Sequence, residues 1–257
     1  MTAVGSHRSP FHQPRLAEMV AAELRGRIVR GDLPDGSMLP KQEDLLSEFQ
    51  VSKPSLREAL RILESEGLIT VRRGNIGGAV VHVPKAANAA QGLAVVLGSG
   101  NVTVRDLGTA LALIEPVCAS LCALRDDREQ TVLPALREVH DQVEQVTDDL
   151  LAGTRLARQF HELLVTQCGN DTLIVTVGAL ETLWAAHQQE WAERVPSSEI
   201  FPTVHRLSQK VHSRIIKLIE RGDAEGVARA VRVHLQETVL VSIADDGDLP
   251  IRGDSLR

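Results

Sequence analysis

The chain has 257 residues, which is enough for one large domain or two of ordinary size. Apolar residues make up 43% of the sequence and charged residues 24%, and this balance excludes wholesale disorder. Only 2% of the residues are aromatic and none is Tyr, so the core has to be built from Leu, Val, Ile and Ala. That composition favours helices over a β-sandwich.

Cysteine content and apolar runs bear on the compartment. The three cysteines, Cys118, Cys122 and Cys168, are too few and too odd in number for a disulfide framework, which points to a reducing cytosol. No apolar run approaches the roughly 18 residues of a membrane span, and the first residues lack the apolar core of a signal peptide. We therefore expect a soluble, cytoplasmic protein with no membrane partner.

The formal net charge of −6, taken over the whole chain, argues against a nucleic-acid partner. Separate counts for the two parts of the chain change this conclusion. Residues 1–84 hold 11 Lys and Arg against 10 Asp and Glu, whereas residues 85–257 hold 17 against 24. An acidic body with a nearly neutral N-terminal module is compatible with DNA binding if the basic residues of that module share one face.

Residues 15–84 have the pattern of three short helices followed by a β-hairpin. Apolar residues recur at helical spacing over 16–29, and Gly31 marks the end of that helix. A second helix is expected over 42–49, and a third from an N-cap at Ser52 to Gly67. The remaining elements are two strands, at 68–71 and 79–83, and the basic, glycine-rich turn at 72–78 between them.

This order of elements predicts a winged helix-turn-helix, whose third helix enters the DNA major groove. Hydroxyl, ammonium and guanidinium groups at the start of that helix can reach phosphates and base edges, and arginines at the hairpin tip can reach phosphates or the minor groove. The candidate DNA-binding residues are Lys41, Ser52, Lys53, Ser55, Arg57, Arg72, Arg73 and Gly74. The alternative is a winged helix that contacts only protein.

The segment VSKPSLREAL at 51–60 resembles the signature of the GntR family of bacterial repressors, and the similarity extends over 16–83. The resemblance implies a homodimer that reads a palindromic operator in double-stranded DNA. Two positions depart from the family pattern: Glu43 stands where an arginine commonly touches DNA, and Lys53 stands where arginine is usual. Lysine cannot form the planar bidentate pair with guanine, so the operator sequence does not transfer from relatives.

Residues 103–244 have helical periodicity throughout and predict an antiparallel bundle. The resemblance to the GntR family implies that this domain binds an effector and dimerises. The expected helices are 103–125, 128–152, 154–168, 171–194, 203–221 and 223–242. Residues 85–102 are expected to form a linker or weakly helical connector, and residues 1–14 and 245–257 a flexible arm and a frayed tail. The predicted fold class is mainly α, a winged helix-turn-helix followed by an all-α bundle.

Three of the nine histidines, His161, His212 and His234, lie on three different predicted helices. Imidazoles from separate helices can converge in a bundle core and hold a metal ion. Taken singly, each is better interpreted as a surface histidine or a hydrogen-bonded core histidine than as a metal ligand.

The local sequences around these histidines resemble the FCD ligand-binding domain of the FadR-like branch of the GntR family. The matching residues are Glu115-Pro116, Phe160-His161, Asn170, His212, Ile216, Ile219, Gly222-Asp223, Ala228, Val231 and His234-Leu235. The resemblance implies a divalent metal of the zinc or nickel type, held by an Asp and three His, with a small carboxylate effector completing the site.

Two polar groups of that family pattern are missing here. The position of the metal-binding Asp is Ala157, and the position of an arginine that clamps the effector carboxylate is Leu111. Three neutral imidazoles can still hold Zn²⁺. The loss of both groups also suits a more apolar pocket, for a hydrophobic acid or an acyl thioester.

These observations predict a DNA-binding transcriptional regulator, a repressor rather than an enzyme, whose operator binding is controlled by an organic or fatty-acid-type effector in the helical domain. The alternative is a metal-dependent enzyme that uses the three-His site to activate water, with the N-terminal module serving protein interaction.

Overall fold

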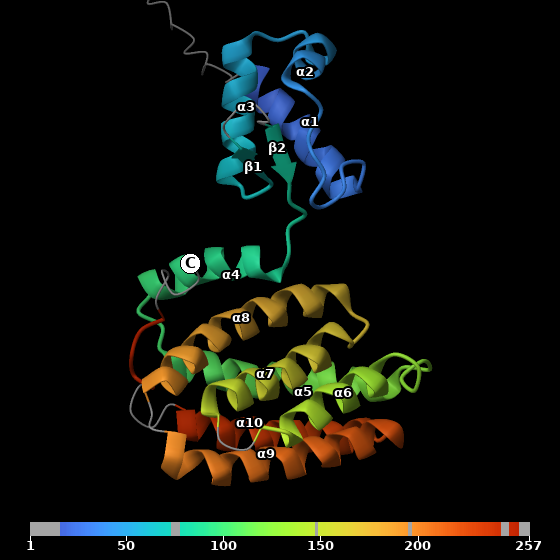
Figure 1. The fold of residues 1–257 in the computed structure, drawn as a ribbon, viewed down its shortest axis with the longest axis vertical. Helices are drawn as coiled ribbons and strands as arrows, with labels where there is room; N and C mark the ends of the chain where they lie inside the picture. The colour runs from blue at the N-terminus through green and yellow to red at the C-terminus, as the bar shows by residue number, and fades with distance from the viewer. Residues whose placement is uncertain (1–15, 73–77, 147–148, 195–196, 243–246, 252–257) are drawn as a thin grey trace, which may run out of the picture. The chain divides into compact units, whose positions relative to one another are not determined.

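The computed structural model describes residues 16–72, 78–146, 149–194, 197–242 and 247–251, and the chain divides into two compact units, residues 1–84 and 85–257 (Figure 1). Apart from the two-stranded hairpin, the described elements are helices, which confirms the predicted fold class.

The N-terminal unit contains three helices and one antiparallel hairpin. Its elements are α1 (Leu16–Arg30), α2 (Gln42–Phe49), α3 (Lys53–Ser65), β1 (Ile69–Arg72) and β2 (Gly78–Val81). Strand β1 pairs with β2 from Ile69 opposite Val81 to Arg72 opposite Gly78. The helices bury one apolar face each, and Leu24, Leu56 and Leu63 meet in the core without solvent exposure. The hairpin tip at 73–77, with Arg73 and Gly74, lies outside the described residues.

Helix α3 begins where the sequence predicts it. Ser52 has an extended backbone, and its hydroxyl accepts a hydrogen bond from the Ser55 amide at 3.3 Å, as an N-cap does. The missing amide hydrogen of Pro54 leaves no unpaired donor in this first turn. Gly67, with a φ of +72°, turns the chain out of the helical region toward β1. The cap therefore fixes which residues face solvent at the start of α3.

The C-terminal unit is a bundle of seven helices among the described residues. They are α4 (Ala86–Ser99), α5 (Val104–Leu124), α6 (Val132–Glu144), α7 (Leu150–Thr166), α8 (Asp171–Arg194), α9 (Ser197–Glu220) and α10 (Ala224–Ser242). Helix α5 runs through the middle of the bundle and contacts α7, α8, α9 and α10 (Figure 1).

Three boundaries differ from the sequence prediction. The segment expected as a linker or weakly helical connector forms the regular helix α4, in which Ala90 and Ala94 are small enough to bury their side chains completely against the bundle. The helix break predicted at Gly153 lies instead before α7, where the Asp149 carboxylate accepts a hydrogen bond from the Ala152 amide and caps the helix. Helix α9 begins before Pro202, earlier than the predicted 203.

Residues 247–251, which fall in the segment predicted as a frayed tail, are packed against the start of α5. The Val104 amide donates to the Leu249 carbonyl at 3.0 Å, and the Arg105 amide donates to the Gly247 carbonyl at 2.9 Å. These are two of the amides that the first turn of a helix cannot pair by itself, so this segment completes α5. Ile251 is buried among the helices.

Helix α5 is long and apolar enough to cross a membrane by length and composition, with a mean hydropathy of 1.8 in its most apolar window. More than half of that window, 56%, is buried within the helical unit. Burial on this scale is typical of the central helix of a folded bundle. No other helix among the described residues passes the same test.

Candidate histidine centre and nucleic-acid interface

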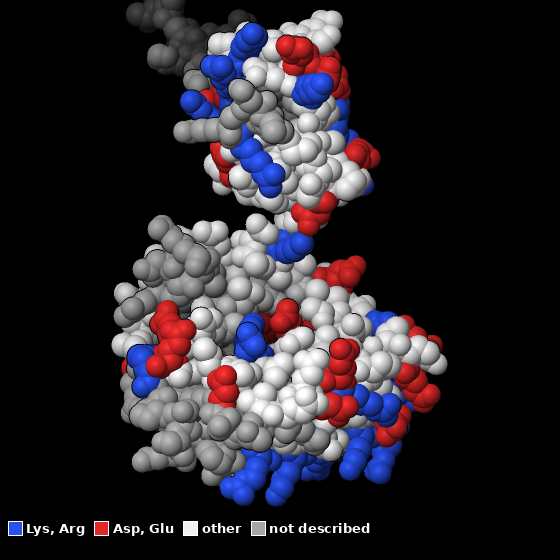
Figure 2. Space-filling view, in the orientation of Figure 1, with Lys and Arg blue, Asp and Glu red and all other residues white. Residues whose placement is uncertain are grey.

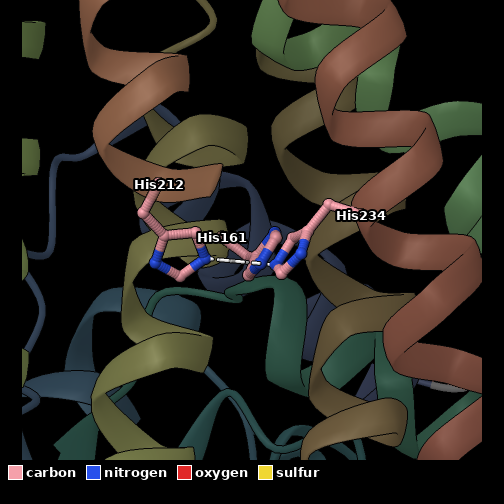
Figure 3. A group of neighbouring side chains, drawn as sticks. All are labelled: His161, His212 and His234. Atoms are coloured by element: carbon pink, nitrogen blue, oxygen red, sulfur yellow. Dashed lines mark hydrogen bonds between the residues drawn. The ribbon is translucent and has the colours of Figure 1, made fainter. Parts of the chain in front are cut away.

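The three predicted histidines meet in the helical unit. His161 lies on α7, His212 on α9 and His234 on α10, and their rings face one another between the helices (Figure 3). The Nε2 atom of His212 lies 3.3 Å from that of His161 and 3.2 Å from that of His234. Side chains separated by up to 73 residues in the sequence therefore present the same atom to one common point.

Packing holds these rings in place. His212 is completely buried and stacks on Phe160, with ring centroids 4.0 Å apart and planes 6° from parallel. His161 and His234 are also buried, at 8% and 5% exposure. An aromatic stack on one side and two imidazoles on the other leave His212 little rotational freedom.

Burial keeps the histidines neutral. It lowers the pKa of His234 to about 3 and the pKa of His212 well below its usual value, because a charged imidazole would lose its hydration. Burial also lowers the pKa of His161, although the negative charge of Glu181 opposes the shift. Neutral imidazole is the form that binds metal ions, so all three side chains are ready to act as ligands at pH 7.

Two buried carboxyl groups lie beside the histidines, and the sequence analysis did not assign either to the site. Glu115 on α5 places its Oε1 atom 2.6 Å from His161 Nδ1, with no solvent exposure. Glu181 on α8 adjoins Glu115. Burial raises the pKa of Glu115 to about 7, and burial together with the neighbouring Glu115 raises that of Glu181 well above its usual range. The sequence signal that could have placed Glu115 in the site was the Glu115-Pro116 match to the family pattern. No sequence signal pointed to Glu181.

The histidine set fits a tetrahedral metal ion. Ligand atoms about 2.05 Å from Zn²⁺ at tetrahedral angles lie about 3.3 Å from one another, which is the spacing of the Nε2 atoms. Glu115 accepts a hydrogen bond from His161 Nδ1 in this arrangement, which directs the Nε2 lone pair inward. No other group of three metal-ligating side chains occurs among the described residues.

The positions that lack the family's polar groups are apolar here. Leu111, at the position of the arginine clamp, is 2% exposed in the core, and Ala157 is half-buried on α7. A ligand that needs a carboxylate at 157 or a guanidinium at 111 would find neither.

In the N-terminal unit, the candidate DNA-binding residues of α3 are exposed. Lys53 and Arg57 face solvent, and no carboxylate among the described residues pairs with either of them. By contrast, three arginines of α1 are neutralised by carboxylates, Arg25 by Glu66, Arg27 by Glu48 and Arg30 by Asp32. Lys and Arg side chains gather over α3 in Figure 2, and two of the unpaired cations of this unit, Lys53 and Arg57, lie where the predicted recognition helix begins.

The other candidates occupy different places around this helix. Ser52 and Ser55 bond to each other through their hydroxyls at 2.9 Å and remain at the surface of the first turn. Lys41, just before α2, is exposed, as is Arg72 at the end of β1. Glu43, in the first turn of α2, is exposed as well. The structure thus brings together the α3 candidates and places Lys41 and Arg72 on neighbouring elements.

Comparison with known families identifies both units. Residues 16–80 match the family of bacterial regulatory proteins named gntR, and residues 106–237, about half of the chain, match the FCD domain. The chain belongs to the gntR family and carries an FCD domain. It is therefore a DNA-binding transcriptional regulator with an effector-binding helical domain, as the sequence predicts.

Similar proteins agree with this assignment. The HTH-type transcriptional repressor NanR of Klebsiella aerogenes is 29% identical over 234 residues, covering 89% of this chain and 86% of its own. NanR of Cronobacter sakazakii is 28% identical over 232 residues, which cover 89% of this chain and 85% of that protein. A GntR structure from Streptococcus agalactiae shares the fold, with a TM-score of 0.67 at 22% identity over 88% of this chain and 99% of that one. These relatives are regulators, which does not favour the alternative of a metal-dependent enzyme.

Proposed function

We propose that this gntR-family regulator is a cytoplasmic repressor that binds a palindromic operator as a homodimer and changes its affinity for the operator when a ligand occupies the helical unit. The observation that carries the proposal is the combination of unpaired cations on α3 with a buried three-histidine centre in one chain. The repressor assignment is supported by the NanR relatives, and the histidine pattern supports placing the chain in the FadR-like branch.

For DNA binding, α3 would lie in the major groove. Arg57 and Lys53 would contact base edges and phosphates, while the Ser52 and Ser55 hydroxyls would contact phosphates beside the first turn. Lys41, together with Arg72, Arg73 and Gly74 of the hairpin, would contact the flanking backbone or the minor groove. Because Arg57 has no carboxylate to release among the described residues, its guanidinium is available to DNA without loss of an ion pair.

A gel-shift titration with the chain's own upstream DNA tests this proposal. We expect a sequence-specific complex that weakens with salt, and an Arg57→Ala variant that binds about 10- to 100-fold less tightly. Arg30→Ala removes the same charge from α1, where Asp32 already neutralises it, and should bind like the parent. Equal binding by the Arg57 and Arg30 variants would contradict the placement of the recognition helix.

For the helical unit, we infer a divalent metal of the zinc or nickel type at His161, His212 and His234. The ion would act as a Lewis acid that offers an open coordination position to an oxygen atom of the effector. The residues of this chain would hold it with three neutral imidazoles and fix the orientation of His161 through Glu115. His212 Nδ1 is buried without a hydrogen-bond partner, so the ring has no other polar contact that explains its place in the core.

Elemental analysis of the purified chain tests the metal site. We expect about one zinc-type ion per chain, lost in the His212→Ala/His234→Ala variant and kept in His187→Ala, a histidine of α8 outside the centre. Absence of metal after incubation with zinc or nickel would contradict the site. The histidines would then serve as polar groups of an apolar pocket, and acyl-type effectors would become the leading candidates.

For the dimer, the outer face of α5 supplies a candidate surface. Leu113, Val117 and Leu124 are 57%, 46% and 63% exposed, and their spacing of four and seven residues places them on one stripe. Exposed apolar stripes of this kind mark protein interfaces. Light scattering should show a dimer for the parent and a monomer for Leu113→Glu/Val117→Glu, whereas a dimeric double variant would place the interface elsewhere.

A further inference from the structure

A cavity in the helical unit is lined by basic and polar side chains. It has a volume of about 330 Å³ and lies between the first half of α7 and the second half of α8. Its polar lining consists of Thr154, Arg155, Arg158, Gln188 and Gln189, and three apolar residues of the same helices complete it. Guanidinium, amide and hydroxyl groups together offer many hydrogen-bond donors, and none of the lining residues is acidic, although the Gln189 amide donates to the Glu193 carboxylate at 3.1 Å.

The two arginines of this cavity have no salt bridge. Arg155 and Arg158 lie one helical turn apart on α7, and no carboxylate within the described ranges comes within ion-pair distance of either. The buried Glu181 carboxyl interacts electrostatically with Arg158, but burial raises its pKa well above the usual range and so favours its neutral form. Two guanidinium groups on one face repel each other, and a bound anion would relieve that repulsion.

The helices that line the cavity also carry part of the histidine centre. Arg158 precedes His161 by three residues on α7, and Ala185, which also lines the cavity, follows Glu181 by four residues on α8. Positions three or four apart lie on adjacent turns of one helix face, so the two helices that line the cavity also carry His161 and Glu181 of the centre one turn away along each helix.

We propose that Arg155 and Arg158 bind the anionic group of the effector, a carboxylate or a phosphate, and that Gln188, Gln189 and Thr154 hydrogen-bond the polar atoms next to it. This inference deepens the proposed function and rests on it, since it names the ligand class of the effector-binding unit. It also shows how the chain recognises an acid although position 111 is leucine: the basic group comes from α7 instead of α5. Planar guanidinium groups bind carboxylates and phosphates in a bidentate manner, which selects for shape as well as charge.

Thermal unfolding of the full chain with simple anions tests the assignment. The probes are succinate, citrate and inorganic phosphate, each compared with sodium chloride at equal ionic strength, and succinamide serves as the neutral analogue of succinate. We expect at least one anion to raise Tm by about 3 °C when present at ten times its Kd, and succinamide to leave Tm unchanged. Preference for succinate and citrate over phosphate, or the reverse, decides which anionic group the site takes.

Variants then locate the binding. Arg158→Gln should lower the affinity for the anion by a factor of about ten or more. Arg158→Lys keeps the charge but loses the planar guanidinium, so its affinity should lie between those of Arg158→Gln and the parent. Arg155→Gln, an exposed change that leaves the core intact, gives a second measurement should Arg158→Gln unfold. Arg232→Gln removes an equal charge from α10 outside the cavity and should bind like the parent.

The outcomes separate this inference from the function on which it rests. No rise in Tm with any of the anions, or an equal rise in the parent and both Arg→Gln variants of α7, would overturn the anion site while leaving operator binding intact. An anion that binds through Arg155 and Arg158 in a chain that fails to bind operator DNA would uphold the site and reject the proposed repressor.

Discussion

The two units place their candidate residues in opposite ways. In the N-terminal unit, the α3 candidates lie within a few residues of one another, point to solvent and need only the local cap at Ser52 to be positioned. In the C-terminal unit, the histidines and their carboxyl partners come from five helices and are almost entirely buried. A site of the first kind depends on local structure alone, whereas one of the second kind exists only when the whole bundle is folded.

Removal of metal should give the largest effect and act on one unit only. An ion present at about 1,000 times its Kd stabilises the folded state by about 4 kcal/mol, and all of that stabilisation arises at α7, α9 and α10. After treatment with a chelator, hydrogen exchange measured by mass spectrometry should speed up in these helices and stay unchanged in α3. Faster exchange in α3 as well would show that the units are not independent in stability.

Glu115→Gln should lower the affinity for the metal about 10- to 100-fold without removing a ligand. The amide cannot accept the His161 Nδ1 proton with the strength of a carboxylate, so the ring is held less firmly in its metal-binding orientation. Competition with a chromogenic zinc chelator measures the change. Glu162→Gln, an exposed carboxylate one residue after His161, is the control, and equal affinities in the two variants would show that Glu115 does not act on the centre.

Acid should destabilise the metal-free helical unit through its histidines. Burial holds the pKa of His234 at about 3, whereas the unfolded chain takes up this proton near pH 6.5. The stability that comes from keeping His234 neutral is therefore fully present above about pH 6.5 and is lost progressively as the pH falls toward 3.

The expected loss from His234 alone is about 1.4 kcal/mol for each pH unit below 6.5, or about 2 kcal/mol at pH 5. Urea titrations of the metal-free protein at pH 7, 6 and 5 measure the free energy of unfolding. His234→Gln should lack this part of the pH dependence, and parallel curves for the parent and the variant would rule out the shifted pKa.

The smallest expected effect separates the two roles of Ser52. Ser52→Ala removes the N-cap and should lower the stability of the N-terminal unit by about 1 kcal/mol. Ser52→Asp keeps the cap but sets a negative charge where phosphate would lie, so it should keep the stability and reduce operator affinity further than Ser52→Ala. Thermal unfolding and gel shifts of the two variants check this, and tight operator binding by Ser52→Asp would place the phosphate away from this residue.

Local signals explain how much could be predicted from the sequence. The cap at Ser52 and the glycines that end α1 and α3 act on their immediate neighbours, so the N-terminal elements agree with the predicted ranges within a residue or two. The predicted helix break at Gly153 was wrong, because a glycine inside a helix cannot be told from a glycine at a helix end by sequence alone. The boundary is set by the Asp149 cap, whose sequence signal is weaker.

Non-local contacts explain the rest. The three histidines could be found because each has a characteristic local sequence, but nothing near Glu181 in the sequence indicates that it approaches Glu115. The same holds for Arg155 and Arg158, whose common cavity depends on the packing of α8 against α7. For α4 the sequence left a linker and a weakly helical connector open, because its alanine- and glycine-rich composition suits both, and the burial of Ala90 and Ala94 decides for the helix.

The attachment of residues 247–251 to the start of α5 has a consequence for biosynthesis. The carbonyls of Gly247 and Leu249, which complete the first turn of the central helix α5, follow all the described helices of the bundle in the sequence and are synthesised after them. The N-terminal unit can fold while the helical unit is still being translated, but the first turn of α5 can be completed only after residues 247–249 have been made. In a newly made chain, the DNA-binding N-terminal unit is therefore complete before the helical unit that regulates it.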